Sequence, residues 1–116
     1  MADFAERFED LRIWQQARQL TNAVYDKLDD CRDYAFRDQM QRAAVSIMNN
    51  ISEGFERRTS NDFGHFLDIA KGSCGEVRSM LYLAEDRSYM TSQVAPKLRD
   101  QAVALSAGIA AFRRKL

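Results

Sequence analysis

The hydrophobic positions between residues 63 and 84 recur at alternating steps of four and three residues. These positions are Phe63, Leu67, Ala70, Cys74, Val77, Leu81 and Ala84. Side chains spaced in this way lie along one face of an α-helix, and a repeat near 3.5 residues is typical of helices packed side by side. The pattern therefore predicts a helix that buries one face in a bundle and ends near Arg87.

Three further stretches show a comparable apolar face. It is formed by Ile13, Ala17, Leu20, Val24 and Leu28, then by Phe36, Met40, Ala44, Ile47, Ile51 and Phe55, and finally by Leu98, Ala102, Leu105, Ile109, Phe112 and Leu116. Connections of only a few residues make sequential helices antiparallel neighbours. The predicted fold is all-α, an antiparallel up-down-up-down four-helix bundle, and residues 1–116 form a single domain.

Polar residues mark the expected helix ends. Asp10 is expected to cap the first helix, which should end near residues 29–31, and the second helix should begin around Asp33. The TSND sequence at residues 59–62 resembles a capping box for the third helix. Pro96 should lie in the first turn of the fourth helix or mark a slight kink, because deeper in a helix it would cost about 3 kcal/mol.

The apolar surface of the third helix is wider than one bundle core requires. The additional positions are Phe66, Ile69, Met80 and Leu83, and a second column on the first helix contains Trp14, Thr21 and Tyr25. One interpretation is that the adjoining helices cover these side chains. The other is a subunit interface, where large amphipathic aromatic residues are common.

Glu76 lies within this apolar strip and needs a partner or water. The second helix offers a polar column made of Gln39, Arg42, Ser46, Asn50, Glu53 and Arg57. Counting outward from residue 59, antiparallel pairing brings Arg42 near Glu76, Ser46 near Ser73, and Glu53 near His65. We expect a structural polar network there, and an ordinary solvated flank is the alternative. Gly72 and Gly75 suggest a close approach of two helices.

Composition and charge limit the functional classes. Seventeen basic and seventeen acidic residues cancel, so the chain lacks the overall positive charge expected of a protein that coats nucleic acid or membranes. Cys31 and Cys74 have the character of reduced intracellular thiols. The sequence has no recognisable signal peptide or membrane span, so we expect a cytoplasmic location and no membrane partner.

The chain lacks a recognisable catalytic pattern. Asp62 and His65 have a spacing found in metal sites, but the sequence holds a single histidine and no second copy of the pair. We therefore expect no metal, no cofactor, no small-molecule substrate and no enzymatic activity. If the protein were an enzyme, Glu53, His65 and Glu76 would be the residues to inspect.

Two basic clusters end helices. They are Arg57 with Arg58, and Arg113, Arg114 and Lys115. Cations at helix C-termini are favoured by the helix dipole, which is one explanation. The other is phosphate recognition, for which arginine is well suited, so these five residues are the candidate contacts to nucleic acid.

Two segments resemble a known family. They are FEDLRIW at residues 8–14 and the stretch 42–76, with NISEG at 50–54, then Arg57 and Arg58, and then Phe63, Phe66, Leu67, Ile69, Ala70, Gly72, Ser73 and Glu76. These segments resemble the four-helix-bundle proteins encoded by intervening sequences in bacterial large-subunit (23S) ribosomal RNA genes. Met48 stands where members often have proline, and Ser88 replaces a frequent glycine.

The resemblance implies an up-down bundle that assembles as a homopentamer. A related branch, the accessory variability determinant of diversity-generating retroelements, implies a basic pentamer that binds nucleic acid and a reverse transcriptase. Two functional hypotheses follow. The first is a non-catalytic assembly or adaptor protein whose homo-oligomer presents a surface to RNA or to a protein partner. The second is an RNA-binding accessory factor that acts with a reverse transcriptase or on ribosomal RNA.

Overall fold

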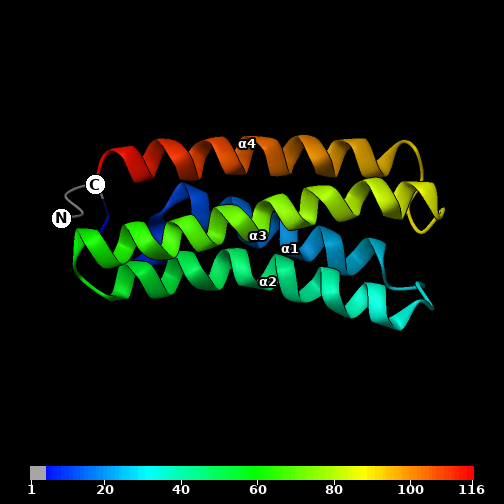
Figure 1. The fold of residues 1–116 in the computed structure, drawn as a ribbon, viewed down its shortest axis with the longest axis horizontal. Coiled ribbons are helices and arrows are strands. Elements are labelled where there is room, and N and C mark those ends of the chain that lie inside the picture. The colour runs from blue at the N-terminus through cyan, green and yellow to red at the C-terminus, as the bar shows by residue number, and fades with distance from the viewer. Residues whose placement is uncertain (1–4) are drawn as a thin grey trace.

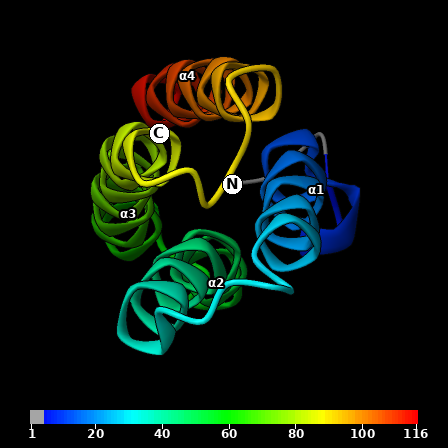
Figure 2. The ribbon, with the colours of Figure 1, turned by 90° about the vertical axis from the view of Figure 1, so that its right-hand side faces the viewer.

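The computed structural model describes residues 5–116, which form four antiparallel α-helices (Figure 1). A 3₁₀ turn, η1, covers Phe8–Asp10, and the α-helices are α1 (Arg12–Lys27), α2 (Tyr34–Glu56), α3 (Ser60–Asp86) and α4 (Val94–Arg114). Viewed along the bundle, the helices follow one another around a common axis, and each packs against its two neighbours in the ring (Figure 2). The predicted up-down-up-down four-helix bundle is confirmed.

The apolar positions predicted from the spacing form the core. Every one of them on α1, α2 and α3 is buried, and on α4 the positions from Leu98 to Ile109 are buried, whereas Phe112 and Leu116 are only partly covered. Phe63 is fully buried, with its ring centroid 5.9 Å from that of Phe55 and 5.3 Å from that of Phe112. These three aromatic residues join α2, α3 and α4 at one end of the bundle.

Three of the four predicted helix starts are correct. Asp33 caps α2 by accepting a hydrogen bond from the Phe36 amide, and the Thr59 hydroxyl accepts one from the Asp62 amide at the start of α3. Pro96 lies in the first turn of α4, where its missing N–H is tolerated. The prediction for Asp10 is wrong. Asp10 ends η1, and Leu11 precedes α1 without a side-chain cap.

Burial explains the different start of α1. Leu11 is 3 % exposed and belongs to the core, so the η1 turn directs an apolar side chain inward at the position that a polar cap would otherwise occupy. Burying a leucine side chain is worth about 1.5 to 3 kcal/mol, whereas a polar cap is typically worth about 1 kcal/mol. The larger hydrophobic contribution therefore decides the geometry.

A contact between two loops closes the end of the bundle opposite the α2–α3 turn. We call this contact of Tyr89 with Asp33 and Phe36 the clasp. The Tyr89 hydroxyl donates a 2.7 Å hydrogen bond to Asp33, and the Tyr89 ring lies 5.1 Å from that of Phe36. The chain reaches Tyr89 through Ser88, whose φ of 60° lies in the left-handed region that favours glycine. The two loops that connect α1 to α2 and α3 to α4 are thus tied together.

The clasp should make stability depend on pH at both extremes. The hydrogen bonds from Tyr89 and from the Phe36 amide lower the pKa of Asp33, so its contribution is present above the unfolded value of 3.8 and is lost as the pH falls through the folded pKa. The bond to Asp33 raises the pKa of Tyr89, so that contribution is present below 10.0 and is lost as the pH rises through the folded pKa.

Tyr89→Phe removes the donor but keeps the ring. We expect it to reduce the difference in unfolding free energy between pH 6 and pH 3, measured by urea titration, because the Asp33 pKa then moves toward its ordinary value. Tyr34→Phe removes a hydroxyl from a tyrosine that is 57 % exposed and serves as the control. An unchanged pH dependence in Tyr89→Phe would contradict the clasp.

Candidate interaction surfaces

A polar contact joins α2 and α3 at mid-length. The Ser46 and Ser73 hydroxyl oxygens are 2.8 Å apart, and the Asn50 amide nitrogen donates to the Ser46 hydroxyl at 2.9 Å and to the Ser46 carbonyl at 2.7 Å. All three residues are partly buried. The predicted proximity of Ser46 to Ser73 is confirmed, and this contact is the structural part of the expected network.

The predicted pair of Arg42 with Glu76 is wrong. Glu76 instead accepts a 3.2 Å hydrogen bond from the Gln39 side-chain amide. Arg42 lies three positions after Gln39, which is a rotation of about 60° around α2, and the Gln39 side chain is the one that reaches Glu76. Arg42 lines an open depression of about 590 Å³ on the outer side of α2, together with Ser46 and Asn50. Since Glu76 is exposed, no buried ion pair holds the two helices.

Glu53 and His65 also find other neighbours. Glu53 forms an ion pair of 3.1 Å with Arg57 on its own helix, and the His65 ring lies 5.8 Å from that of Phe66. Among residues 5–116, no hydrogen bond or ion pair joins Glu53 to His65, so the expected polar network does not include a direct contact between them. Glu53, His65 and Glu76 are all exposed, and none of them lines the depression on α2.

The close approach of α2 and α3 occurs at Gly54, which the sequence reasoning missed. A Cβ atom added at Gly54 would lie 2.7 Å from the Cβ of Phe66 and 2.9 Å from a ring atom of Phe63. At Gly72 and Gly75 an added Cβ meets nothing within 4 Å, so the close approach expected there is wrong. The missed signal was the position of Gly54 beside Phe55, within the apolar face of the second helix.

Alanine should have opposite effects at these glycines. Gly72→Ala and Gly75→Ala should each raise the unfolding free energy of the protomer by about 0.5 to 1 kcal/mol, because alanine is the better helix former and meets no obstacle. Gly54→Ala should lower it by about 1 to 3 kcal/mol through overpacking. Urea titration measures all three, and stabilisation by Gly54→Ala would contradict the packing described above.

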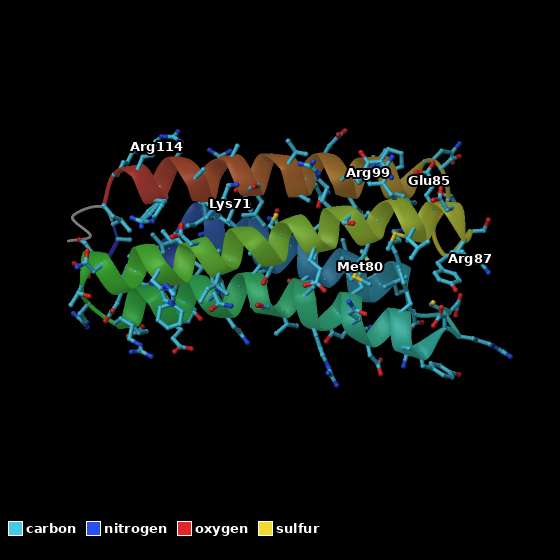
Figure 3. The ribbon with its side chains drawn as sticks, in the orientation of Figure 1. Lys71, Met80, Glu85, Arg87, Arg99 and Arg114 are labelled. Atoms are coloured by element: carbon cyan, nitrogen blue, oxygen red, sulfur yellow. The ribbon has the colours of Figure 1, made fainter. Side chains whose placement is uncertain are left out.

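The apolar strip predicted as an interface is only partly exposed. Ile69 is 41 % exposed, Leu83 47 % and Tyr25 43 %, whereas Phe66, Met80 and Trp14 are partly buried. Met80 lies on the side of α3 that faces α2 (Figure 3). The Trp14 ring packs edge to face on Phe8, with centroids 5.1 Å apart. The strip therefore combines exposed aliphatic side chains with side chains that are already partly buried within the protomer.

Thr21 does not belong to the exposed column on α1. Its hydroxyl is buried and donates to the Ala17 carbonyl at 2.8 Å, and it also lies 3.1 Å from the Ala44 carbonyl of α2. A buried hydroxyl that finds acceptors on two helices contributes to the packing of α1 against α2. The interface predicted on α1 is thereby reduced to Tyr25, with Trp14 partly covered.

The two basic clusters lie at the same end of the bundle. The turn between α2 and α3 and the end of α4 meet there (Figure 1). Arg57 is engaged by Glu53 and by the Phe66 ring, 5.0 Å away, and Arg113 pairs with Asp68 at 3.3 Å. The other three residues of the clusters are exposed, and their side chains have no hydrogen-bond or ion-pair partner within residues 5–116. They are Arg58, Arg114 and Lys115.

The described residues offer little for metal or thiol chemistry. Within residues 5–116, no group of three or more histidine, cysteine or acidic side chains could hold a metal ion. Cys31 and Cys74 are both free and buried. Burial raises the pKa of Cys74 to about 11, so its thiol is protonated at neutral pH. The thiol donates a hydrogen bond of 3.1 Å to the Ala102 carbonyl. Over the same residues, no helix is long and apolar enough to cross a membrane.

The fold and these surfaces define a small antiparallel four-helix-bundle protein with polar and apolar patches on its helix faces. The chain belongs to the 23S rRNA-intervening sequence protein family, whose model matches residues 9–111. The family predicted from the sequence segments is therefore confirmed. A search of curated proteins gives no significant match.

A solved structure has the same fold. It is a protein of unknown function from the S23 ribosomal protein family of Bacteroides thetaiotaomicron VPI-5482, which aligns with a TM-score of 0.80. The alignment covers 86 % of this chain and 96 % of that chain, at 18 % sequence identity. At this identity the likeness supports the fold and carries no information on residues or partners.

Proposed function

We propose that the protein is a non-catalytic assembly or adaptor protein that forms a homo-oligomer, a ring of five subunits, and presents a surface to a macromolecular partner. The observation that carries the proposal is the exposure of Ile69 and Leu83 on α3, beside a bundle core that is already complete without them. Exposed aliphatic side chains on one helix face favour burial against another chain.

A closed ring needs two different patches on each subunit that meet head to tail. Tyr25 lines the depression on the outer side of α2 from the α1 side, whereas Ile69 and Leu83 are exposed on α3. The two patches therefore lie on different helices of the protomer. This arrangement supports a heterologous contact in which one patch covers the other on the neighbouring subunit.

The mass in solution tests the assembly directly. Light scattering on the purified chain at micromolar concentration should give five times the protomer mass of 13.4 kDa. The mass of a dimer would support a subunit interface but contradict a ring of five subunits. A monomer would overturn the proposal.

The absence of catalysis is part of the proposal. Glu53, His65 and Glu76 are exposed and do not converge on one cavity, and the Cys74 thiol is protonated and buried at neutral pH. A cytoplasmic location is also proposed, because both cysteines are free, as expected in a reducing compartment. No cofactor and no small-molecule substrate are included in the proposed function.

A second candidate function is that of a nucleic-acid-binding accessory factor, related to the accessory determinant of diversity-generating retroelements. The observation that favours it is the convergence of the two basic clusters at one end of the bundle (Figure 1). Arg58, Arg114 and Lys115 are free to meet phosphates, whereas Arg57 and Arg113 are already held by acids. Single-stranded RNA is therefore the probe for binding at this end of the bundle.

Salt-dependent RNA binding distinguishes the two candidates. If the basic end binds RNA, Arg58→Ala, Arg114→Ala and Lys115→Ala should each lower the slope of log affinity against log salt by roughly 0.7 per lost phosphate contact. Fluorescence anisotropy with a labelled oligouridine measures the slope. Arg42→Ala removes a free cation from the outer side of α2 and is the control. The RNA candidate fails if the native chain does not bind at low salt or if the triple variant binds as well as the native chain.

A further inference from the structure

The side of the bundle where α3 meets α4 carries positive charges that no acid neutralises. Lys71 and Arg78 are exposed, and neither side chain has an ion-pair or hydrogen-bond partner within the described residues. Lys71 precedes Cys74 by three residues and Arg78 follows it by four, so the three side chains share one face of α3. The Cys74 thiol donates to the Ala102 carbonyl of α4, which places both cations on the α4 side of α3. On α4, residues 101–116 contain no aspartate or glutamate. The zero net charge of the chain therefore conceals a locally positive face.

Exposed apolar surface accompanies these charges. Tyr82 is 55 % exposed, and its ring carries the Arg99 guanidinium at 4.2 Å from the ring centroid. Glu85 fixes that guanidinium through an ion pair of 2.8 Å. Val103, one turn beyond Arg99 on α4, is 48 % exposed. We call Lys71, Arg78, Tyr82, Arg99 and Val103 the α3–α4 patch; Lys71, Glu85 and Arg99 can be followed along it in Figure 3.

The spacing of the free cations matches the repeat of a helix. Lys71 and Arg78 are seven residues apart, which is about 10.5 Å along the α3 axis. Carboxylates seven residues apart on a partner helix have the same separation, so two ion pairs can form along one contact line. An apolar partner surface would remove the exposed areas of Val103 and the Tyr82 ring from water, which is favourable.

Single-stranded nucleic acid fits this patch less well. Its phosphates could pair with Lys71 and Arg78, but stacking on protein needs successive aromatic rings, and Tyr82 is the one aromatic side chain of the patch. The aliphatic Val103 would remain in water. The combination of two free cations with aliphatic and aromatic surface favours a polypeptide that is both acidic and apolar.

We propose that the α3–α4 patch binds an amphipathic helix of a partner protein, with acidic residues seven positions apart that pair with Lys71 and Arg78 and an apolar face that covers Val103 and Tyr82. This inference rests on the proposed adaptor function and names the chemistry of its partner. The patch lies on the α4 side of α3. Leu83 follows Tyr82 by one residue and is turned from it by about 100° around the helix, so the proposed subunit contact uses a different face of α3.

Two designed peptides test the patch. Each is a fluorescein-labelled helix with leucines along one face. The acidic peptide has glutamates seven residues apart along the flank, and the basic peptide has lysines at the same positions. Fluorescence anisotropy with the full chain should show binding of the acidic peptide only, and raising the salt concentration should weaken it.

Charge reversal provides the decisive comparison. Lys71→Glu with Arg78→Glu should weaken binding of the acidic peptide by about tenfold or more and should create binding of the basic peptide, which a misfolded variant could not do. Arg12→Glu with Arg42→Glu reverses two exposed, unpaired arginines on α1 and α2 and should leave the affinity for the acidic peptide unchanged.

Three results would overturn the inference. They are no binding of the acidic peptide, equal losses in the two double variants, and binding of labelled oligouridine through Lys71 and Arg78 in place of the acidic peptide, which would make the patch a nucleic-acid surface. Light scattering on the same samples separates the two levels of the proposal. If the protein is an oligomer but binds neither peptide, the proposed assembly function stands and only the proposed partner helix is rejected.

Discussion

Glutamate in place of Leu83 is expected to separate the assembled protein into folded protomers. Leu83 is 47 % exposed on α3, so within a single protomer the new carboxylate remains in water and costs little. Within a subunit contact the same carboxylate would be buried without a partner, at a cost of several kcal/mol. Because about 1.4 kcal/mol corresponds to a tenfold change in dissociation constant, the assembly should weaken by two orders of magnitude or more.

Val103→Glu is the matched control for this experiment. Val103 is 48 % exposed on α4, nearly the same exposed fraction as Leu83, and it does not belong to the strip on α3. Light scattering should show an intact oligomer for Val103→Glu and protomers for Leu83→Glu, while circular dichroism should show helical bundles for both. If both variants dissociate, or neither does, the strip containing Ile69 and Leu83 is not the specific interface.

Alanine in place of Phe63 is expected to cost the protomer about 3 to 5 kcal/mol. Phe63 is completely buried and contacts both Phe55 and Phe112, so its removal leaves a cavity where α2, α3 and α4 meet. The backbone of α2 at Gly54 packs against the Phe63 ring. This backbone cannot easily move into the cavity, because the hydrogen bonds of the helix hold it in place. A domain of this size has a total stability of roughly 5 to 15 kcal/mol.

Urea titration at low protein concentration measures the loss in the protomer alone. Tyr34→Ala removes a large ring that is 57 % exposed, and it should change the unfolding free energy by less than about 0.5 kcal/mol. A loss below about 1 kcal/mol in Phe63→Ala would show that the aromatic cluster is loosely packed. The description of this end of the bundle would then be wrong.

Much of the fold could be predicted because helix periodicity is a local property. The alternating step along residues 63–84 identifies a buried face without any knowledge of what covers it, and every predicted core position on α1, α2 and α3 is buried. The caps at Asp33 and Thr59 were also predictable, since a cap depends only on residues within one turn. Four such helices with short connections leave few arrangements other than an up-down bundle.

The candidate surfaces were harder to predict, because they depend on the rotation of each helix about its axis. The rotation of the helices decided that Gln39 and not Arg42 bonds to Glu76, and that Gly54 of α2, in place of Gly72 of α3, lies at the close helix contact. Neither difference changes the hydrophobic repeat. Sequence spacing therefore predicted which helices meet and that Ser46 lies near Ser73, but not the polar partner of Glu76.

The bundle, the order of its helices, its core positions and its family could all be predicted from the amino-acid sequence, because these follow from repeats and short segments within single helices. The tertiary structure alone decided that Arg113 pairs with Asp68 of α3, and that within residues 5–116 Lys71 and Arg78 form no ion pair on the side of the bundle that also exposes Val103. The physical reason is distance. Ion pairs form only within a few ångströms, and contacts between side chains on different helices are fixed only when those helices pack.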